Sequence, residues 1–418
     1  MRWLRRFLLP IVLLILLPST IQAQLTDSGD LADWVDQLVD DMPGSSGDDY
    51  GLPTASELQE WNAMLDQLFA GNLSTAADIA QTLDYDLTLF LDLPTNRTYQ
   101  VLTANGNNYW GTYIRYPQYC RPLVMQAPHP RRDLNTGRQA LHVFRESNSA
   151  AFMMAGTHRC NSEENSSCSG STTVCSGGAS EAYPISDLAH HVENVFQLTT
   201  AYLFGEIEES YFFSLHGFTK GDNDPYLIMS NGTRVTPSPD YISLLADALA
   251  AEDPVLTTEA AHLNLNWTRL IGFTNVQGRE INGSANPCST NADASTGRFL
   301  HVEQERTRLR NNLAGWNKMA NAVQAIFPCV TVGVEQLEQE MPLSIFPNPS
   351  RGQVRIEGDI ELDDRALFLF NHLGQDVSSH LRVSRVGEKA ISLDLSSLPG
   401  GLYFLRCGPS SGRLILQR

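Results

Sequence analysis

The spacing of hydrophobic residues along this chain changes from helical to strand-like and back, and the changes divide it into regions. Leu58, Trp61 and Leu65 lie three or four positions apart and predict a helix over residues 55–69. A Gly-Asn break at 71–72 is followed by a second helical stretch that ends near Leu83. We therefore expect a helical hairpin, which carries no obvious chemistry and packs on another layer.

From about residue 86, short apolar runs alternate with helical patterns. The predicted strands are 98–102, 111–116, 123–127, 151–156, 211–215 and 299–303, and the predicted helices are 139–148, 187–203, 241–251 and 313–326. Such alternation is typical of an α/β domain, so we predict a central mixed sheet flanked by helices on both faces, phosphorylase/hydrolase-like in class. After residue 343 the apolar runs are short and separated by turn residues, which predicts a small all-β sandwich.

The first 23 residues have the pattern of a secretory signal peptide. Arg2, Arg5 and Arg6 precede an apolar run over 8–17, and Ala23 is a small residue suited to cleavage. The alternative is an uncleaved membrane anchor, but the run is shorter than the roughly 20 residues that span a bilayer. No other stretch approaches that length, so we expect no transmembrane segment after signal removal.

Residues 24–52 are acidic and rich in Gly, Ser and Asp, which predicts a flexible lead-in with one short helix near 34–39. The predicted organisation is therefore a signal peptide (1–23), an acidic lead-in with the helical hairpin (24–85), an α/β domain (86–330), an acidic linker (331–342) and a β module (343–418).

The charge and the cysteine content indicate in which kind of compartment the protein lies and which classes of partner are disfavoured. The formal net charge is −18, and removal of the three arginines of the signal leaves about −21, which disfavours nucleic acid as a partner. Six of the seven cysteines lie in the central region, and in an oxidising compartment they predict three disulfides with the pairing left open. The alternative is a structural zinc site at Cys160, Cys168 and Cys175, but their spacing lacks the C-x₂₋₄-C pattern of such sites.

The β module carries four ordered motifs. They are Ile-Phe-Pro-Asn-Pro-Ser at 345–350, Phe-Asn with Leu-Gly-Gln at 370–375, Leu-Asp-Leu at 393–395 and Leu-Pro-Gly-Gly-Leu-Tyr-Phe at 398–404. Together they resemble the type A sorting domain of the Bacteroidota type IX secretion system, although Arg413 and Arg418 stand where that family usually has a Lys-rich strand. The resemblance implies the type IX secretion machinery as a partner, passage through the periplasm and a secreted or cell-surface location. The alternative is an ordinary β-sandwich appendage for adhesion.

Polar residues follow three of the predicted apolar strands. His129 comes after the strand at 123–127, His216 follows the strand at 211–215, and Glu303 ends the strand at 299–303. The carboxyl ends of such strands meet at one edge of an α/β sheet. A hydrolytic zinc site needs N or O ligands, an open position and a carboxylate base. We therefore predict Zn²⁺ held by His129, His216 and Asp133, with Glu303 as general base.

The order of these residues resembles the zinc carboxypeptidase and N-formylglutamate amidohydrolase superfamily, over residues 98–330. In that resemblance His129 matches the first ligand, His216 the second histidine and Glu303 the base. The first loop departs from the family, since carboxypeptidases have H-x-x-E and this chain has H-x-x-x-D, which leaves Glu146 as a second choice of acidic ligand.

The resemblance also implies an arginine that holds a substrate carboxylate near the segment 155–161. Arg159 is the candidate, with His158 beside the metal or the leaving group. The alternative is that both residues only tie a cysteine-rich loop to the rest of the domain.

The predicted function is hydrolysis of an amide bond by a secreted zinc enzyme, carboxypeptidase-like or acting on N-acyl amino acids. The substrate would be a peptide or an N-acyl amino acid with a free carboxylate. No G-x-S-x-G, P-loop or dinucleotide-binding motif occurs, so other common hydrolase and nucleotide chemistries are disfavoured. The alternative is a non-catalytic secreted or cell-surface binding protein that retains the hydrolase fold.

Overall fold

The computed structural model describes residues 25–329, 343–357, 367–371, 375–387, 389–407 and 410–417. The predicted signal peptide (1–23) and the predicted linker (331–342) lie outside the described residues. The chain divides into two compact units, with the division after Cys329.

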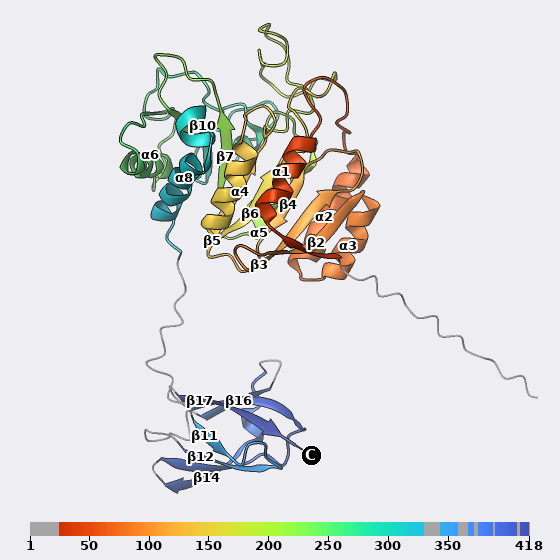
Figure 1. Cartoon of the computed structure of the whole chain (residues 1–418), viewed down its shortest axis with the longest axis vertical. Coiled ribbons are helices and arrows are strands. Elements are labelled where there is room, and N and C mark those ends of the chain that lie inside the picture. Colours follow the sequence, from red (N-terminus) through yellow and green to blue (C-terminus); the bar gives the residue numbers. More distant parts are fainter. Residues whose placement is uncertain are drawn as a thin grey trace, which may run out of the picture. The chain divides into compact units, whose positions relative to one another are not determined.

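The first unit is built on one large mixed sheet (Figure 1). Its strands are β1 (Leu25–Gly29), β2 (Tyr85–Asp92), β3 (Arg97–Ala104), β4 (Thr112–Arg115), β5 (Arg121–Ala127), β6 (Ser149–Met154), β7 (Tyr211–Gly217), β8 (Leu227–Ser230), β9 (Thr258–Ala260) and β10 (Phe299–Gln304). The ten strands lie in the order β1-β2-β3-β4-β6-β5-β7-β10-β8-β9. The central strands β6, β5, β7 and β10 are parallel to one another, so their carboxyl ends meet at one edge.

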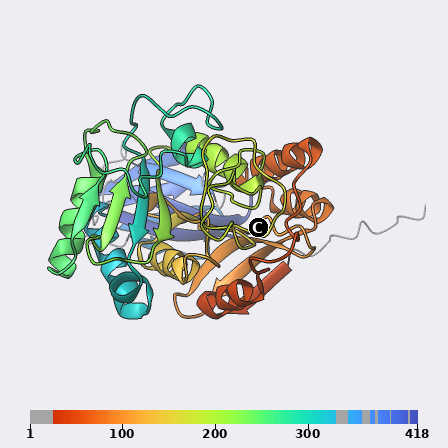
Figure 2. The same ribbon diagram turned by 90° about the horizontal axis from the view of Figure 1, so that it is seen from above.

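Helices cover both faces of this sheet, as Figure 2 shows. One face carries α1 (Leu31–Asp41), α4 (Thr136–Glu146), α6 (Tyr241–Glu252) and α8 (Leu313–Ile326), and the other carries α2 (Ala55–Phe69), α3 (Leu73–Thr82), α5 (Val195–Glu206) and α7 (Val276–Ile281). Side chains alternate between the two layers along each strand. On β5, Leu123 and Met125 face the first layer and Val124 faces the second. The predicted α/β class with a mixed sheet is confirmed, and α2 and α8 have the predicted bounds.

The prediction of a flexible lead-in at 24–52 is wrong for its first part. Residues 25–29 form β1, which pairs in parallel with β2 at the edge of the large sheet. Asp30 then caps α1 by accepting from the Ala32 N–H, and the helix buries Leu31, Val35 and Val39. An edge strand is held by backbone hydrogen bonds, which composition does not reveal. The acidic residues lie on the outer face of an amphipathic helix.

The predicted helix at 187–203 is also wrong at its start. The helix α5 begins at Val195, with the Asn194 side chain accepting from the Gln197 N–H. Residues 187–194 form an irregular segment in which Leu188 and Ala189 are buried. The Asp187 side chain contacts His129 and Arg159 outside this segment and His190 within it.

The second unit is a small all-β module with two antiparallel sheets. Its strands are β11 (Ser344–Phe346), β12 (Gln353–Glu357), β13 (Leu367–Asn371), β14 (Arg382–Gly387), β15 (Ala390–Asp394), β16 (Gly401–Cys407) and β17 (Ser410–Leu416). The sheets have the orders β11-β12-β15-β14 and β13-β16-β17 and share one apolar core that includes Val354, Ile391 and Leu405. The predicted β sandwich is confirmed.

The six central cysteines form three disulfides, as predicted. The pairs are Cys120–Cys329, Cys160–Cys175 and Cys168–Cys288. This pairing removes the alternative of a zinc site at Cys160, Cys168 and Cys175, because a cysteine in a disulfide has no thiolate with which to bind a metal. Two of the bridges fasten the long segment between β6 and α5, one of the loops gathered at the carboxyl ends of the central strands (Figure 1).

Candidate metal centre

Three neighbouring parallel strands place the polar side chains at one edge of the sheet. His129 follows β5 by two residues, and His216 and Glu303 lie near the ends of β7 and β10. The strands β7 and β10 pair so that His216 is opposite Glu303 and Ser214 is opposite His301. Since these residues alternate with the apolar Phe213, Leu215 and Val302 of the first layer, they all face the α5 side.

Three atoms from these strand ends converge. The Nδ1 atoms of His129 and His216 lie 3.2 Å apart, and the Asp133 Oδ2 lies 3.4 Å from the first and 3.5 Å from the second. Asp133 reaches this position through the turn after β5, in which its backbone N–H donates to the His129 carbonyl. The spacing His-x-x-x-Asp therefore brings both side chains of one short turn to the same point.

The far nitrogen of each imidazole has its own partner. His129 Nε2 lies 2.9 Å from the Asp187 Oδ1, and His216 Nε2 lies 2.9 Å from the Ser214 hydroxyl. A carboxylate can only accept, so His129 donates its Nε2 hydrogen, which in the neutral ring leaves the lone pair on Nδ1. Ser214 can hold His216 in the same tautomer. Such outer partners are what orient histidine ligands in metal sites.

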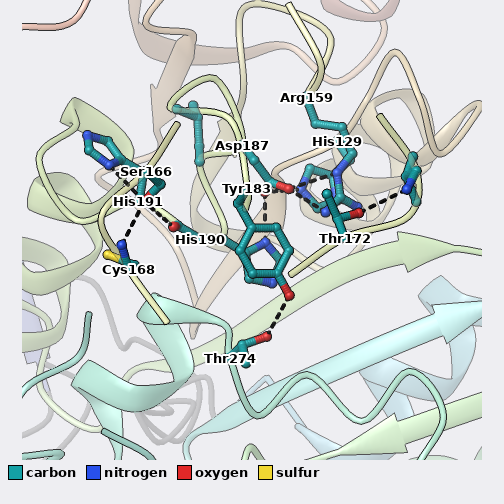
Figure 3. A network of polar contacts seen from close by, with 12 residues as sticks. His129, Arg159, Ser166, Cys168, Thr172, Tyr183, Asp187, His190, His191 and Thr274 are labelled. Atoms are coloured by element: carbon teal, nitrogen blue, oxygen red, sulfur yellow. Dashed lines mark hydrogen bonds and ion pairs between the residues drawn. The ribbon is translucent and has the colours of Figure 1, made fainter. Parts of the chain in front are cut away.

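Asp187 is the hub of the network around the centre (Figure 3). Its carboxylate is fully buried and accepts from Arg159 Nε at 2.8 Å, from Arg159 Nη2, and from His190 Nδ1 at 2.8 Å. His190 in turn stacks on Tyr183, with ring centroids 3.7 Å apart, and the Tyr183 hydroxyl lies 3.1 Å from Thr274 Oγ1. The orientation of His129 is therefore fixed by Asp187, which is itself held by Arg159 and His190.

Burial and neighbouring charges shift the pKa values of these groups. Burial opposes ionisation of Asp133, but hydrogen bonds with His129 and His216 bring its pKa below the usual range. Burial lowers the pKa of His216 to about 4, and it also lowers that of His301, helped by the neighbouring His216. Burial and the Asp133 charge raise the pKa of Glu303 to about 8. Burial and the Arg159 charge oppose protonation of His129, but Asp187 and Asp133 raise its pKa above the usual value. A neutral His216 imidazole and an ionised Asp133 carboxylate thus both offer lone pairs to the centre.

The cluster fits a divalent metal. Two ring nitrogens and a carboxylate oxygen lie within 3.5 Å of one another, and with both rings deprotonated at Nδ1 a cation would relieve the repulsion between their lone pairs. Tetrahedral Zn²⁺ with ligands at about 2.0–2.1 Å sets its ligands about 3.3 Å apart, which matches these separations. Two further groups of metal-ligand types adjoin it, His129 with Asp187 and His190, and His216 with His301 and Glu303.

Glu303 lies beside this cluster with a free oxygen. Its side chain is 7 % exposed, and Oε2 has no hydrogen-bond partner among the described residues. Buried His301 Nδ1 is unpartnered in the same way. Gly272, with a φ of +66°, packs its backbone against the His301 ring, where a Cβ would come within 2.7 Å. Two unsatisfied polar atoms on one face of β10 indicate a place for water or substrate.

Arg159, His158 and Glu146, the remaining residues predicted for the site, are not part of the cluster formed by His129, Asp133 and His216. Arg159 borders the centre, but its Nε and Nη2 donate to Asp187, and Nη1 lies 3.3 Å from His129 Nδ1. The His158 Nδ1 accepts from the Cys160 N–H, and His158 is in none of the three groups of metal-ligand side chains. Glu146, the alternative ligand, is exposed at the end of α4, just before β6 begins at the opposite edge of the sheet.

Two cavities adjoin the centre and share Arg159 and Glu303 in their walls. One has a volume of about 460 Å³ and is bordered by His129, His216 and His301. The second has a volume of about 630 Å³ and is bordered by Asp133. Substrate would therefore have room on two sides of the metal-ligand cluster.

Asp187, His190 and His301 are site residues that sequence reasoning missed or rated low. Asp187 and His190 lie in the segment misassigned as a helix, so their convergence on His129 was not visible. His301 had a signal, because it precedes Glu303 by two positions on a strand and so shares its face.

Comparison with known proteins identifies the second unit. Residues 344–416 match the family described as the secretion system C-terminal sorting domain. The β module is a secretion sorting domain. It implies the type IX secretion machinery as partner, and secretion or cell-surface attachment as destination. Among the described residues, no helix combines the length and apolarity needed to cross a membrane.

Two solved structures are similar to this chain at low sequence identity. N-formylglutamate amidohydrolase from Ralstonia eutropha JMP134 has 12 % identity and a TM-score of 0.34, over 52 % of this chain and 95 % of that one. A provisionally assigned metallopeptidase from Shewanella baltica OS155 has 12 % identity and a TM-score of 0.27, over 52 % of this chain and 79 % of that one. No curated protein matches the sequence.

Proposed function

We propose that this protein is an exported zinc-dependent hydrolase of amide bonds, with His129, His216 and Asp133 as the metal ligands. The observation that carries the proposal is the convergence of two imidazole Nδ1 atoms and a carboxylate oxygen within 3.5 Å, with each far nitrogen held by a buried partner. The amide class follows from the order of strand-end residues, which resembles zinc carboxypeptidases and N-formylglutamate amidohydrolases. The route through the periplasm is part of the same proposal.

Each residue has a distinct role in this proposal. When bound, Zn²⁺ would supply an acidified water and a Lewis acid for the scissile carbonyl. Glu303 takes a proton from the attacking water on its unpartnered Oε2 and returns it to the leaving nitrogen. Arg159 directs Nε and Nη2 to Asp187 and Nη1 toward His129, so its guanidinium is engaged within the network. It borders both cavities, but it does not present the two-pronged grip on a carboxylate that the resemblance implies.

The test combines metal analysis with turnover in three proteins. We expect wild type to hold stoichiometric zinc and to hydrolyse members of a panel of N-acyl amino acids and short peptides. Glu303→Gln should keep the zinc and lose about 10²–10⁴-fold in turnover, because the amide cannot accept a proton. Glu146→Gln is the matched control, since this exposed carboxylate lies away from the centre, and it should retain both properties.

Two results would contradict the proposal. A wild-type protein that binds no zinc after purification in zinc-containing buffer would favour the alternative, a binding protein that retains the fold. A Glu303→Gln variant with wild-type turnover would remove Glu303 as the base.

A further inference from the structure

The three loops that build the metal centre also carry cations. His129 is followed by Arg132, His216 by Lys220, and Glu303 by Arg306. In each loop the cation comes three or four residues after the site residue, once the chain has left the carboxyl end of its strand. All three cations border the 630 Å³ cavity, so the fold that assembles the metal ligands assembles this basic surface as well.

This cavity, here called the basic cavity, is positive in an acidic protein. Arg132, Arg159, Lys220, Arg269, Arg306 and Arg310 border it, against the carboxylates of Asp133, Glu303 and Glu305. The whole chain has a formal net charge of −18. An excess of cations in one concave site of an anionic protein concentrates anionic ligands there, and the effect weakens with salt.

The cations that border the basic cavity differ in whether they have partners within the protein. Arg310 is buried and donates to the carbonyls of Gln304, Leu134 and Phe218, so it has a structural role. Arg269 pairs with Asp224 at 3.2 Å. In contrast, Arg132, Lys220 and Arg306 form no ion pair with any carboxylate in the described part of the chain.

Local contacts fix the segments that carry two of these cations. Glu305 caps the π-helical turn η1 (Arg306–Arg310) by accepting from the N–H groups of Thr307 and Arg308, which fixes the first residue of the turn at the cavity wall. The Lys220 Nζ donates to the Gly221 carbonyl at 3.1 Å and lies 5.2 Å from the centroid of the Tyr226 ring, with no carboxylate partner among the described residues. Both residues border the cavity, and neither charge is neutralised by a carboxylate of the described residues.

The 460 Å³ cavity on the other side of the shared wall differs in character. Hydroxyl and apolar side chains such as Thr172, Tyr183, Phe273 and Thr274 border it, and Arg159 is its only cationic lining residue among those described. The metal-ligand cluster lies where the two cavities meet, because Glu303 and Arg159 border both. A substrate bound across the centre would thus place its neutral part on one side and its anionic part on the other.

We propose that the basic cavity binds an acidic peptide segment with two or more carboxylates, joined to the scissile amide, while a neutral group occupies the other cavity. This inference rests on the proposed amide hydrolysis, which supplies the peptide chemistry. The cavity volume lies in the range of about 300–1,000 Å³ that holds drug-sized ligands, larger than one amino acid requires. Guanidinium groups match carboxylates with paired hydrogen bonds, which suits Arg132 and Arg306 to this role.

The test measures binding directly, in the full-length Glu303→Gln variant so that turnover does not interfere. Tri-glutamate and tri-glutamine are titrated by calorimetry, at low salt and at an ionic strength of about 0.15 M. We expect tri-glutamate to bind more tightly, with an affinity that falls as salt rises. Replacing Arg132, Lys220 and Arg306 together by glutamine should weaken it about tenfold, as expected for the loss of three exposed charge contacts.

The matched control is Arg308→Gln. Arg308 belongs to the same turn as Arg306, but its guanidinium pairs with Asp253 at 3.0 Å, outside the cavity lining. This variant should bind tri-glutamate like its parent. Equal affinity for the two tripeptides, or equal losses in the triple variant and the Arg308→Gln control, would overturn the proposal. Tighter binding of an anionic oligosaccharide than of tri-glutamate would overturn the peptide assignment.

Repeating the titration after metal removal by a chelator separates this inference from the proposed function. Retained preference for tri-glutamate without metal supports the basic cavity even if the protein hydrolyses nothing. Conversely, hydrolysis of neutral acyl-peptides by wild type, with no preference for acidic ones in binding, would leave the proposed function standing and reject the acidic-peptide site.

Discussion

The α/β unit buries many charged and polar side chains, whereas the C-terminal unit buries hardly any. His129, Asp133, Asp187 and His216 are all at most 7 % exposed in the first unit. Among the described residues of the second unit, the buried polar side chains are two serines, Ser350 and Ser410, around an otherwise apolar core. Buried charges cost stability unless they are paired, so a concentration of them indicates a site with chemistry.

The contrast also shows where each unit presents its function. In the α/β unit the candidate metal ligands are buried at the end of a sheet where several loops meet. Along β16 of the sorting domain, Leu402 and Phe404 are exposed, and they alternate with buried Tyr403 and Leu405. A small module with an apolar interior and no buried ionisable cluster is suited to being recognised from outside, in agreement with its role as a sorting signal.

The largest expected effect comes from removing the second unit. Deletion of residues 343–418 should abolish appearance at the cell surface or in the medium of a type IX-competent host, because the sorting domain is the part that the secretion machinery recognises. Cell fractionation with immunodetection measures this. Full-length Glu303→Gln is the control and should be exported normally, because Glu303 lies in the α/β unit and not in the sorting domain. Equal surface delivery of the truncated protein would mean that the α/β unit carries its own export signal for the outer membrane.

The next effect concerns the ligands. His129→Ala or His216→Ala removes one of three ligand atoms, and the remaining two should not hold zinc at stoichiometric occupancy. Zinc per chain, measured by mass spectrometry, should fall to near zero, while export stays intact. His142→Ala is the control, because His142 lies on α4 against Asn317 and outside the cluster. Zinc retained in both ligand variants would show that the metal, if any, binds elsewhere.

Replacing Asp187 should lower zinc affinity by less than replacing His129, the proposed ligand that it contacts. Asp187→Asn should keep the fold but lower zinc affinity about 10–100-fold, because an outer carboxylate fixes the tautomer of its histidine ligand. Competition with a chromogenic chelator measures this affinity. Asp92→Asn is a well-matched control, since Asp92 is equally buried and pairs with Arg145 at 3.1 Å, far in sequence from the centre. Equal zinc affinity in the two variants would reduce Asp187 to a structural role.

Asp187 also shows what the sequence could and could not predict. His129, His216 and Glu303 were predicted because each follows an apolar strand, and in parallel strands the carboxyl ends meet at one edge. Asp187 belongs to no strand. It lies in an irregular segment directly before α5, so the sequence pattern favoured one continuous helix from Asp187, whereas the helix begins at Val195.

In the fold as well, elements determined by local sequence were predicted, whereas those determined by contacts between distant residues were not. Helices with a strong period, such as Ala55–Phe69 and Leu313–Ile326, were predicted with their bounds because local spacing determines them. The strand β1 was missed because backbone pairing with β2 holds it in place, and the paired residues, such as Leu25 and Thr88, are 63 positions apart in the chain. The existence of disulfides followed from the even number of central cysteines. Their pairing did not, because Cys168 meets Cys288 only through tertiary structure.

The smallest effect concerns a second Asp–His pair, in which His262 is buried and Asp240 is half-buried and which belongs to no group of metal-ligand side chains among the described residues. Asp240 caps α6 by accepting from the Ile242 and Ser243 N–H groups, and its Oδ2 lies 2.9 Å from His262 Nε2. Burial opposes ionisation, but hydrogen bonds from Ser243 and His262 lower the pKa of Asp240 below its usual value. Asp240→Asn should therefore leave zinc content unchanged and cost about 1 kcal/mol in the free energy of unfolding, as is typical for a helix cap.

The pH dependence gives this last prediction its sign. A carboxyl with a lowered folded-state pKa stabilises the protein fully above its unfolded pKa, about 3.9, and the contribution is lost as pH falls through the folded value. Thermal unfolding of wild type and Asp240→Asn should thus differ at pH 6 and converge as the pH falls below about 4. A constant difference down to pH 3 would show that the charge of Asp240 does not stabilise the fold. A loss of zinc in this variant would instead extend the functional network beyond the carboxyl ends of β5, β7 and β10.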